Sequence, residues 1–495
     1  MKSIKKILAS FLTLTLLFSI HGCEDILNEP VRSQFAESNL LATKQGILSV
    51  LVDAYSKNND VTMTRNVVKR EEMTTDILWQ SGGGEQGTAT PLINFRWDSS
   101  NPMEAIDWIE YWRVIRNANI VIENLDNVKD FSNDQEKKQL LAESRFMRIW
   151  AYYQLWNEFG TLPIRKSLQD PLEIPRATEE EFKNFVESEL KDVIPDLPTP
   201  GNEPAYGRFH KGGAQALLCI WYLNTHQWQN CTNVAQDIIA SDYFKLHPDY
   251  SEMFALKNEQ NKEFILVKTK LANTNNANTL FATAVPSFPS VYKMGLDGGL
   301  NGVINEKWSN FASNYRLYDQ FYYSFEPNDQ RRNRILTRYV NTTNITVNLL
   351  DYPDCTRAMK YPPDPDGTGS SHGNDVPMIR YAEILLAKAE ALNELNGPIQ
   401  ESIDLINQIR NRAGLGNILL SEFTTKEGLR NHILDERAWE FWYEGKRRRD
   451  LIRMGKYIEY AHNRGITNAT DYHVWFPIPQ SAIDANPLLE QNPGY

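Results

Sequence analysis

The sequence predicts a mainly α-helical fold, because helical periodicity recurs along the chain and long irregular stretches separate the periodic segments. The longest periodic segment covers residues 135–159, where apolar residues including Leu140 and Trp156 recur at spacings of three and four. This spacing places them on one face of a helix. Gly160 and Pro163 follow the segment directly and are expected to end the helix.

Two pairs of adjacent periodic segments predict helical hairpins. The first pair covers residues 211–224 and 228–239, and the second covers 378–395 and 398–413. Gly414 then suits the left-handed position that often follows a helix. Two separated hairpins predict packing like that of tetratricopeptide-repeat helices, without a regular repeat.

Between these blocks lie three long stretches rich in Gly, Asn, Pro and Ser. They cover residues 81–98, 271–306 and 352–377. Irregular segments of this length inside a compact domain are usually functional. We therefore expect the ligand-binding residues in these loops.

The N-terminus has the order of parts found in an export signal. Three lysines lie within the first six residues, and the apolar run 7–20 is shorter than the ~20 residues that a spanning helix needs. Gly22 and Cys23 follow, and Cys23 is predicted to be the lipidated N-terminus of the mature protein. The alternative is an ordinary secretory signal with an incidental cysteine. We thus expect a signal peptide at 1–22 and one membrane-anchored domain at 23–495.

The composition limits the partners of the mature chain. A formal net charge of −11 argues against nucleic acid, because phosphate binding needs a basic face. The basic run 446–449 is interleaved with acidic neighbours and is expected to be structural. Cys219 and Cys231 lie on apolar faces and are expected to be buried thiols, although a bridge between them stays open. No cofactor or metal is predicted.

Five stretches carry a family resemblance. They are "AESRFMRIWAYYQLWNEFGTLPI" from Ala142, "MIRYAEILLAKAEALNELNG" from Met378, "INQIRNRAGL" from Ile406, "ILDERAWEFWYEGKRRRDLIRMGKY" from Ile433 and the terminal "VWFPIPQSAIDANPLLEQNPGY". With them the chain resembles the SusD/RagB family of outer-membrane nutrient-binding lipoproteins. The resemblance implies a helical SusD-like fold with an N-terminal part at about 24–210 and a C-terminal part at about 211–495.

The resemblance also implies a function. It implies a lipid-anchored protein on the outside of the outer membrane that captures a glycan. A SusC-like TonB-dependent transporter would then receive the glycan, and no catalysis is expected. The same architecture capturing peptides is the main alternative. A structural or adhesive surface protein is a further one, and a glycoside hydrolase is a distant one.

Enzyme signals in the sequence are weak. Glu436, Glu440 and Glu444 recur every four residues and could form the paired carboxylates of a glycosidase. We expect them instead to pair with Arg437, Arg447 and Arg448 along the same helix. No histidine lies in an HExxH arrangement, and the glycine-rich "SGGGEQG" lacks the lysine of a phosphate loop.

The range 364–375 is ambiguous. Asp364, Asp366 and Asp375 occupy positions one, three and twelve of a possible calcium loop. The last of these would usually be glutamate, and no clear helix enters the loop. A solvated Pro/Gly turn is therefore the default prediction, with calcium as the alternative.

Sugar recognition needs flat aromatic faces beside planar polar groups. Loop residues of these types are the predicted ligand contacts: Trp79, Gln80, Glu85, Tyr292, Asn301 and Trp308. Each of them could instead belong to the core. By contrast, Phe311, Tyr315, Tyr318, Tyr322 and Phe325 recur at helical spacing and are assigned to packing.

Overall fold

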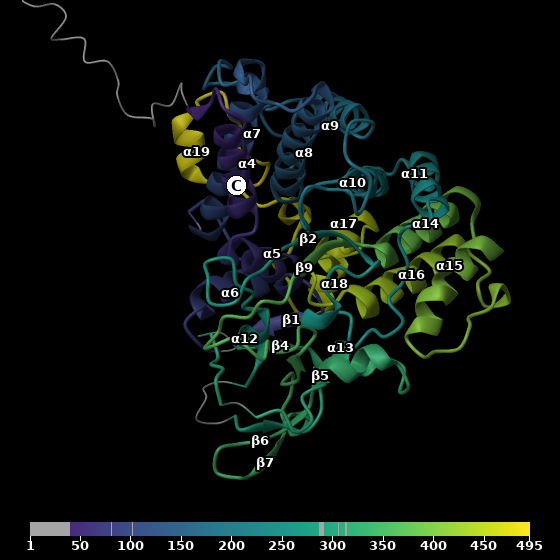
Figure 1. Cartoon of the computed structure of the whole chain (residues 1–495). Coiled ribbons are helices and arrows are strands. Elements are labelled where there is room, and N and C mark those ends of the chain that lie inside the picture. Colours follow the sequence, from purple (N-terminus) through teal and green to yellow (C-terminus); the bar gives the residue numbers. More distant parts are fainter. Residues whose placement is uncertain (1–39, 81, 101, 287–291, 305, 312–313) are drawn as a thin grey trace, which may run out of the picture.

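The computed structural model describes residues 40–495, apart from residues 81, 101, 287–291, 305 and 312–313 (Figure 1). The helices up to the first hairpin are α4 (Lys44–Asn58), α5 (Val61–Met73), α6 (Gln86–Ile93), α7 (Pro102–Asn124), α8 (Asp134–Phe159), α9 (Glu179–Val193), α10 (Lys211–Asn224) and α11 (Trp228–Ala240). The later helices are α12 (Leu280–Ala284), α13 (Asp319–Ser324), α14 (Tyr381–Asn396), α15 (Gln400–Arg412), α16 (Lys426–Phe441), α17 (Arg447–Arg453), α18 (Tyr457–Asn463) and α19 (Gln480–Ala485). The mainly α prediction is confirmed. The predicted leader and Cys23 lie outside the described residues.

Short antiparallel strand pairs join the helical blocks. The pairs are β1 (Leu78–Gln80) with β4 (Tyr315–Leu317), β2 (Phe264–Lys268) with β9 (Val376–Arg380), and β5 (Ile335–Leu336) with β8 (Arg357–Ala358). A three-stranded sheet has the order β3 (Met294–Gly295), β6 (Arg338–Val340) and β7 (Thr346–Asn348). Figure 1 shows α8, α9 and α10 at the top of the molecule and β1, β4 and α12 below them.

The long amphipathic segment forms α8, as predicted. The Asn133 side chain caps its first turn by accepting from the Glu136 backbone N–H at 2.9 Å. Gly160 follows the last residue with φ +77°, a conformation that costs little only for glycine. Chain direction therefore changes at Gly160.

Both predicted hairpins are present. Helices α10 and α11 pack together, α14 packs on α15, and α11 packs on α14, so the hairpins form one layered block. The start of the second hairpin differs from the prediction, because Met378 belongs to β9, the strand that pairs with β2. The sulfur atoms of Cys219 and Cys231 lie 3.8 Å apart, well beyond the ~2.05 Å of a disulfide, and both cysteines are buried thiols.

The aromatic run from Phe311 to Phe325 is not one helix. Tyr315 lies in β4 opposite Gln80, and α13 begins only at Asp319. Helical spacing was misleading here because β1 offers the segment a strand partner from a distant part of the chain. The expected role in packing holds for Tyr315, which is fully buried.

Among the described residues, no helix has the length and apolar character that crossing a membrane requires.

Candidate functional site

The three glutamates that resemble a glycosidase pair are buried in ion pairs. Glu440 contacts Arg380 at 2.9 Å and also pairs with Arg412. Glu436 contacts Arg331 at 2.6 Å. Burial alone would raise the pKa of Glu440, but Arg412 and Arg380 hold its pKa far below the ordinary value. A permanently charged, enclosed carboxylate cannot act as a general acid.

The expected partners of these glutamates were wrong. Arg447 instead pairs with Asp76, and Arg448 with Glu71, both from the N-terminal part of the chain. Helix α16 ends at Phe441, so Glu444 does not continue its face. Glu444 binds Arg380 at 2.8 Å. Pairing therefore connects distant segments rather than neighbouring turns.

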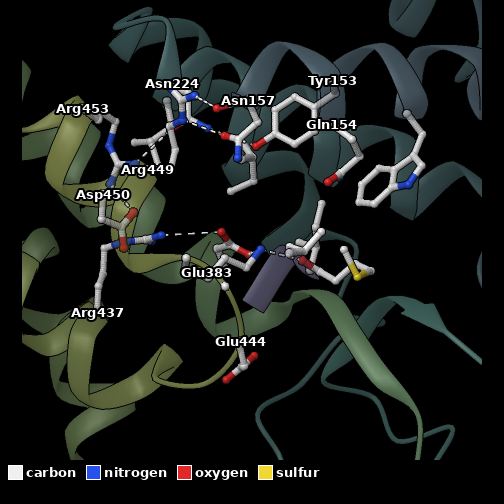
Figure 2. Close-up of a pocket in the computed structure, with 18 residues that line it drawn as sticks. Tyr153, Gln154, Asn157, Asn224, Glu383, Arg437, Glu444, Arg449, Asp450 and Arg453 are labelled. Atoms are coloured by element: carbon white, nitrogen blue, oxygen red, sulfur yellow. Dashed lines mark hydrogen bonds and ion pairs between the residues drawn. The ribbon is translucent and has the colours of Figure 1, made fainter. Parts of the chain in front are cut away.

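A small polar cavity of about 50 Å³ lies among α8, α10, α14, α16 and α17 (Figure 2). The charged side chains that line the cavity bind other side chains of the protein. Asp450 accepts from Arg437 at 2.8 Å and from Arg453 at 2.9 Å, and Arg449 donates to Asn157 at 2.6 Å. The volume suits a few water molecules and is too small for a sugar ring. The cavity is therefore part of the scaffold.

Trp79 lies in β1 with its indole partly exposed. Its Nε1 donates to the Asp354 carbonyl at 2.8 Å. The ring stacks on Tyr318, with centroids 6.3 Å apart, and the Arg316 guanidinium lies 5.3 Å from its centroid. These contacts fix the orientation of the indole plane.

Glu85 is partly exposed just before α6, and two cations neutralise it. Its carboxylate contacts Arg65 at 3.0 Å and Lys69 at 3.3 Å, and the Tyr315 hydroxyl donates to it at 3.2 Å. Gln80, by contrast, is buried and donates to the Gly82 carbonyl at 3.0 Å. The Gln80 side chain therefore packs inside the protein rather than facing solvent.

Trp308 is the second partly exposed tryptophan of the loops. Its Nε1 donates to the Asp364 carbonyl at 3.1 Å. Phe281 packs edge-on against the ring at 5.8 Å. As at Trp79, a backbone carbonyl and an aromatic neighbour hold the indole in place.

The remaining two candidates differ in exposure. Tyr292 is buried against Tyr339, with ring centroids 5.7 Å apart. Asn301 is exposed in a turn that bridges to Gly295 in the β3 sheet. Tyr292 therefore belongs to the core, which was the alternative for each candidate.

Phe311 links the loop of Trp308 to Glu85 through Arg65. The Phe311 backbone N–H donates to Ala282 at 3.0 Å, and the Arg65 guanidinium lies 4.5 Å from the Phe311 centroid. Arg65 in turn binds Glu85. Side chains alternate along β1, so Trp79 projects to the other side of the β1–β4 pair from Tyr315 and Glu85. We use the name aromatic face for the set Trp79, Glu85, Arg65, Phe311 and Trp308.

Sequence reasoning missed two members of the aromatic face. Phe311 was assigned to helix packing, and Arg65 gave no signal because it lies inside the helical segment of α5. Arg316, which covers Trp79, was also missed. Only the β1–β4 register, with Trp79 opposite Arg316, places it there.

The possible calcium loop binds its own backbone instead. The two carboxylate oxygens of Asp364 accept the backbone N–H groups of Asp366 at 2.8 Å and Gly373 at 2.9 Å. Asp375 accepts from the Lys270 backbone N–H at 2.8 Å. These contacts favour a turn over the calcium alternative, and the second half of the loop is buried rather than solvated. In the described part of the chain, no group of three or more His, Cys, Asp and Glu side chains could hold a metal.

The same loop contains a G-x-S-x-G spacing at residues 369–373 that sequence reasoning missed. In hydrolases the serine of such a motif lies on a sharp turn from a strand into a helix. Here Ser371 accepts from the Asn273 backbone N–H at 2.7 Å, and strand β9 follows. Burial lowers the pKa of neighbouring His372 to about 4, and its Nδ1 accepts from the Asp364 backbone N–H. No nucleophile is activated at this turn.

A helical scaffold that presents an aromatic face on irregular loops defines a class of binding protein, and the comparisons give its family. A model described as "SusD family" matches residues 297–495, and one described as "Starch-binding associating with outer membrane" matches 29–223. The chain belongs to the SusD/RagB family.

Relatives of known name agree with this assignment. The SusD-like protein P25 of Formosa agariphila is 27% identical, over 96% of both chains. The starch-binding protein SusD of Bacteroides thetaiotaomicron is 25% identical, over 87% of this chain and 85% of that one. The second is named as a binding protein, in agreement with the prediction that the chain is not an enzyme.

The fold also matches solved structures of the family. Surface glycan-binding protein A from Bacteroides thetaiotaomicron, solved in complex with laminarihexaose, superposes with a TM-score of 0.73. It is 21% identical, and the match covers 91% of this chain and 99% of that chain. The SusD-like fold is thereby confirmed.

Proposed function

We propose that this protein captures an oligosaccharide or polysaccharide on the aromatic face. Three observations support the proposal: the family of the chain, the names of its glycan-binding relatives, and two partly exposed tryptophans in its loops. The last observation carries the most weight for this chain, because its own residues make it.

The tryptophans suit sugar binding because their indole planes are held before any ligand arrives. Each indole N–H already donates to a backbone carbonyl, Asp354 for Trp79 and Asp364 for Trp308. A sugar ring can stack its C–H face on such a plane with little loss of side-chain freedom. The partly exposed Glu85, which the buried Arg65 contacts, offers acceptors to hydroxyl groups.

The charge of the aromatic face favours a glycan over a cationic peptide. Glu85 is the acidic member of this surface, and Arg65 and Lys69 both contact its carboxylate. The surface is therefore not acidic, whereas capture of a cationic peptide would require an acidic surface.

We infer that the glycan passes to a SusC-like TonB-dependent transporter and that Cys23 carries the lipid anchor at the outer face of the outer membrane. The family resemblance and the order of parts in the leader support both inferences. Two or more acyl chains, at ~0.8 kcal/mol per buried methylene, would hold the protein stably on a bilayer.

Calorimetric titration of the chain from residue 24 onward tests the proposal. The ligands are laminarihexaose, maltohexaose, other defined oligosaccharides and a peptide panel. We expect saturable sugar binding that weakens about tenfold in Trp79→Ala or Trp308→Ala, since an aromatic contact contributes about 0.5–1.5 kcal/mol beyond the area it buries and about 1.4 kcal/mol corresponds to tenfold. Tyr323→Ala, an exposed aromatic on α13, is the matched control and should bind as the parent does. Binding of peptides alone would refute the proposal.

A further inference from the structure

A second hollow lies on the helical side of the molecule, away from the aromatic face. Its volume is about 600 Å³, within the ~300–1,000 Å³ typical of ligand sites. The end of α8, the start of α9, the turn after α10 and the C-terminal segment form its walls. In Figure 1 these helices lie in the upper part of the molecule, above β1 and α12. We call it the helical-side cavity.

Aromatic side chains from distant segments form one wall of this cavity. Trp156 lies 4.7 Å from Trp221 and 6.0 Å from Trp475, measured between ring centroids. Trp475 is partly exposed, and the Arg449 guanidinium lies 5.0 Å from its centroid. The wall therefore offers an apolar surface whose tryptophans are held by packing.

Several polar groups that line the cavity have no partner among the described residues. The indole N–H of Trp221 is buried and makes no hydrogen bond. Within the described chain, Glu179 and Lys183, on successive turns of α9, make no ion pair, and the Thr161 hydroxyl makes no hydrogen bond. A buried donor without a partner is unfavourable, so a ligand group that reaches it gains a full hydrogen bond.

Arg176 stiffens the entrance of the cavity. Its guanidinium donates to the carbonyls of Thr161 at 2.8 Å and Phe159 at 3.1 Å, and to the Asn492 side chain at 2.6 Å. It thereby ties the chain after α8 to the C-terminal segment. The segment that carries Thr161 is in this way held against the C-terminal segment before a ligand binds.

We infer that the helical-side cavity is a second saccharide-binding site. An indole wall next to unpaired donors, a carboxylate and a hydroxyl fits a polyhydroxylated ring, whose hydroxyl groups both donate and accept. Arg176, Glu179 and Lys183 together leave a net charge of about +1 at the rim, low enough to suit a neutral sugar. A second site on the same chain would raise the apparent affinity for a long polymer that reaches both sites.

The test separates the two sites. Trp79→Ala/Trp308→Ala is made first to disable the aromatic face, and the protein from residue 24 onward is titrated with laminarihexaose, maltohexaose and a glycan array. We expect this double variant to keep binding to at least one glycan. Adding Glu179→Gln or Thr161→Val should then weaken that binding about tenfold, the loss expected for one hydrogen bond in a binding site. Glu180→Gln, an exposed neighbour outside the cavity, should leave it unchanged.

Two outcomes would overturn the inference. The double variant could bind no glycan, which places all sugar binding on the aromatic face and leaves the proposed function standing. Alternatively its residual binding could be insensitive to Glu179→Gln, Lys183→Gln and Thr161→Val, or be to peptides alone. If residual sugar binding is lost in these cavity variants while the parent's binding is insensitive to Trp79→Ala, the aromatic face fails and the cavity stands.

Discussion

Replacing Glu440 with glutamine removes one charge from the buried centre of the C-terminal part. Glu440 has no exposed surface, and one of its oxygens contacts both Arg380 and Arg412. Its second oxygen lies 3.4 Å from Arg331. The amide keeps the shape of the side chain, so the change tests charge rather than packing.

The expected loss of unfolding free energy depends on which carboxylates the three arginines still contact in the variant. Removing one partner of a buried ion pair typically costs 3–5 kcal/mol. In the variant, Arg412 still contacts Glu263 at 3.0 Å, and Arg331 still contacts Asp329 at 2.7 Å. Because no guanidinium is left without a partner, we expect about 3 kcal/mol, the lower end of the range.

Urea unfolding followed by circular dichroism at pH 7 measures this loss. Glu394→Gln is the control, since Glu394 pairs with the partly exposed Arg430 and should contribute about 1 kcal/mol or less. The pKa of Glu440 is held below its ordinary value, so its stabilisation is present above the unfolded pKa of about 4.5 and is lost as the pH falls further. A loss no larger than that of Glu394→Gln at pH 7 would refute the account of this ion-pair centre.

Three further outcomes are expected. Gly414→Ala should lower the unfolding free energy by about 1–2 kcal/mol, because Gly414 has φ +78°, whereas Gly416→Ala in open space should change it little. Burial and then Asp375 raise the pKa of Glu259 to about 7, so the folded state holds this proton more tightly than the unfolded chain. The stabilisation from Glu259 is lost as the pH rises from about 4.5 to 7, and Glu259→Gln should gain stability relative to the parent over that window in urea titrations. Calcium or a chelator should leave the melting temperature unchanged, because backbone N–H groups fill the Asp364 carboxylate; a shift with calcium would contradict this.

Local patterns predicted the helical scaffold well. The α8 helix and both hairpins depend on periodicity within one segment and on the glycines that follow, such as Gly160 and Gly414, both with positive φ. The family motifs lie mostly in this scaffold. The division at about residue 210 stays a prediction, although ion pairs such as Arg448–Glu71 join its two parts.

Features that depend on distant segments could not be read from the sequence. Strand β1 has three residues and no alternation to detect, and its partner β4 lies more than 200 residues away. The aromatic spacing after Phe311 therefore indicated a helix that the pairing prevents. The helical-side cavity was missed for the same reason, since Trp156 and Trp475 come together only through the fold.

The scaffold motif near the C-terminus also sets the position of Trp79. The carboxylate of Glu72, on α5, accepts the backbone N–H groups of the turn at residues 443–445. Asp76 then binds Arg447 through two contacts of 2.8 Å, only three residues before Trp79. Burial raises and Arg447 lowers the pKa of Asp76, and the net effect is a lowered pKa, so the pair stays charged at neutral pH. Because α5 runs directly into β1, these contacts hold the aromatic face against the C-terminal helices. The contacts that residues 443–447 of the C-terminal motif make with Glu72 and Asp76 therefore also orient Trp79, a residue of the proposed binding surface.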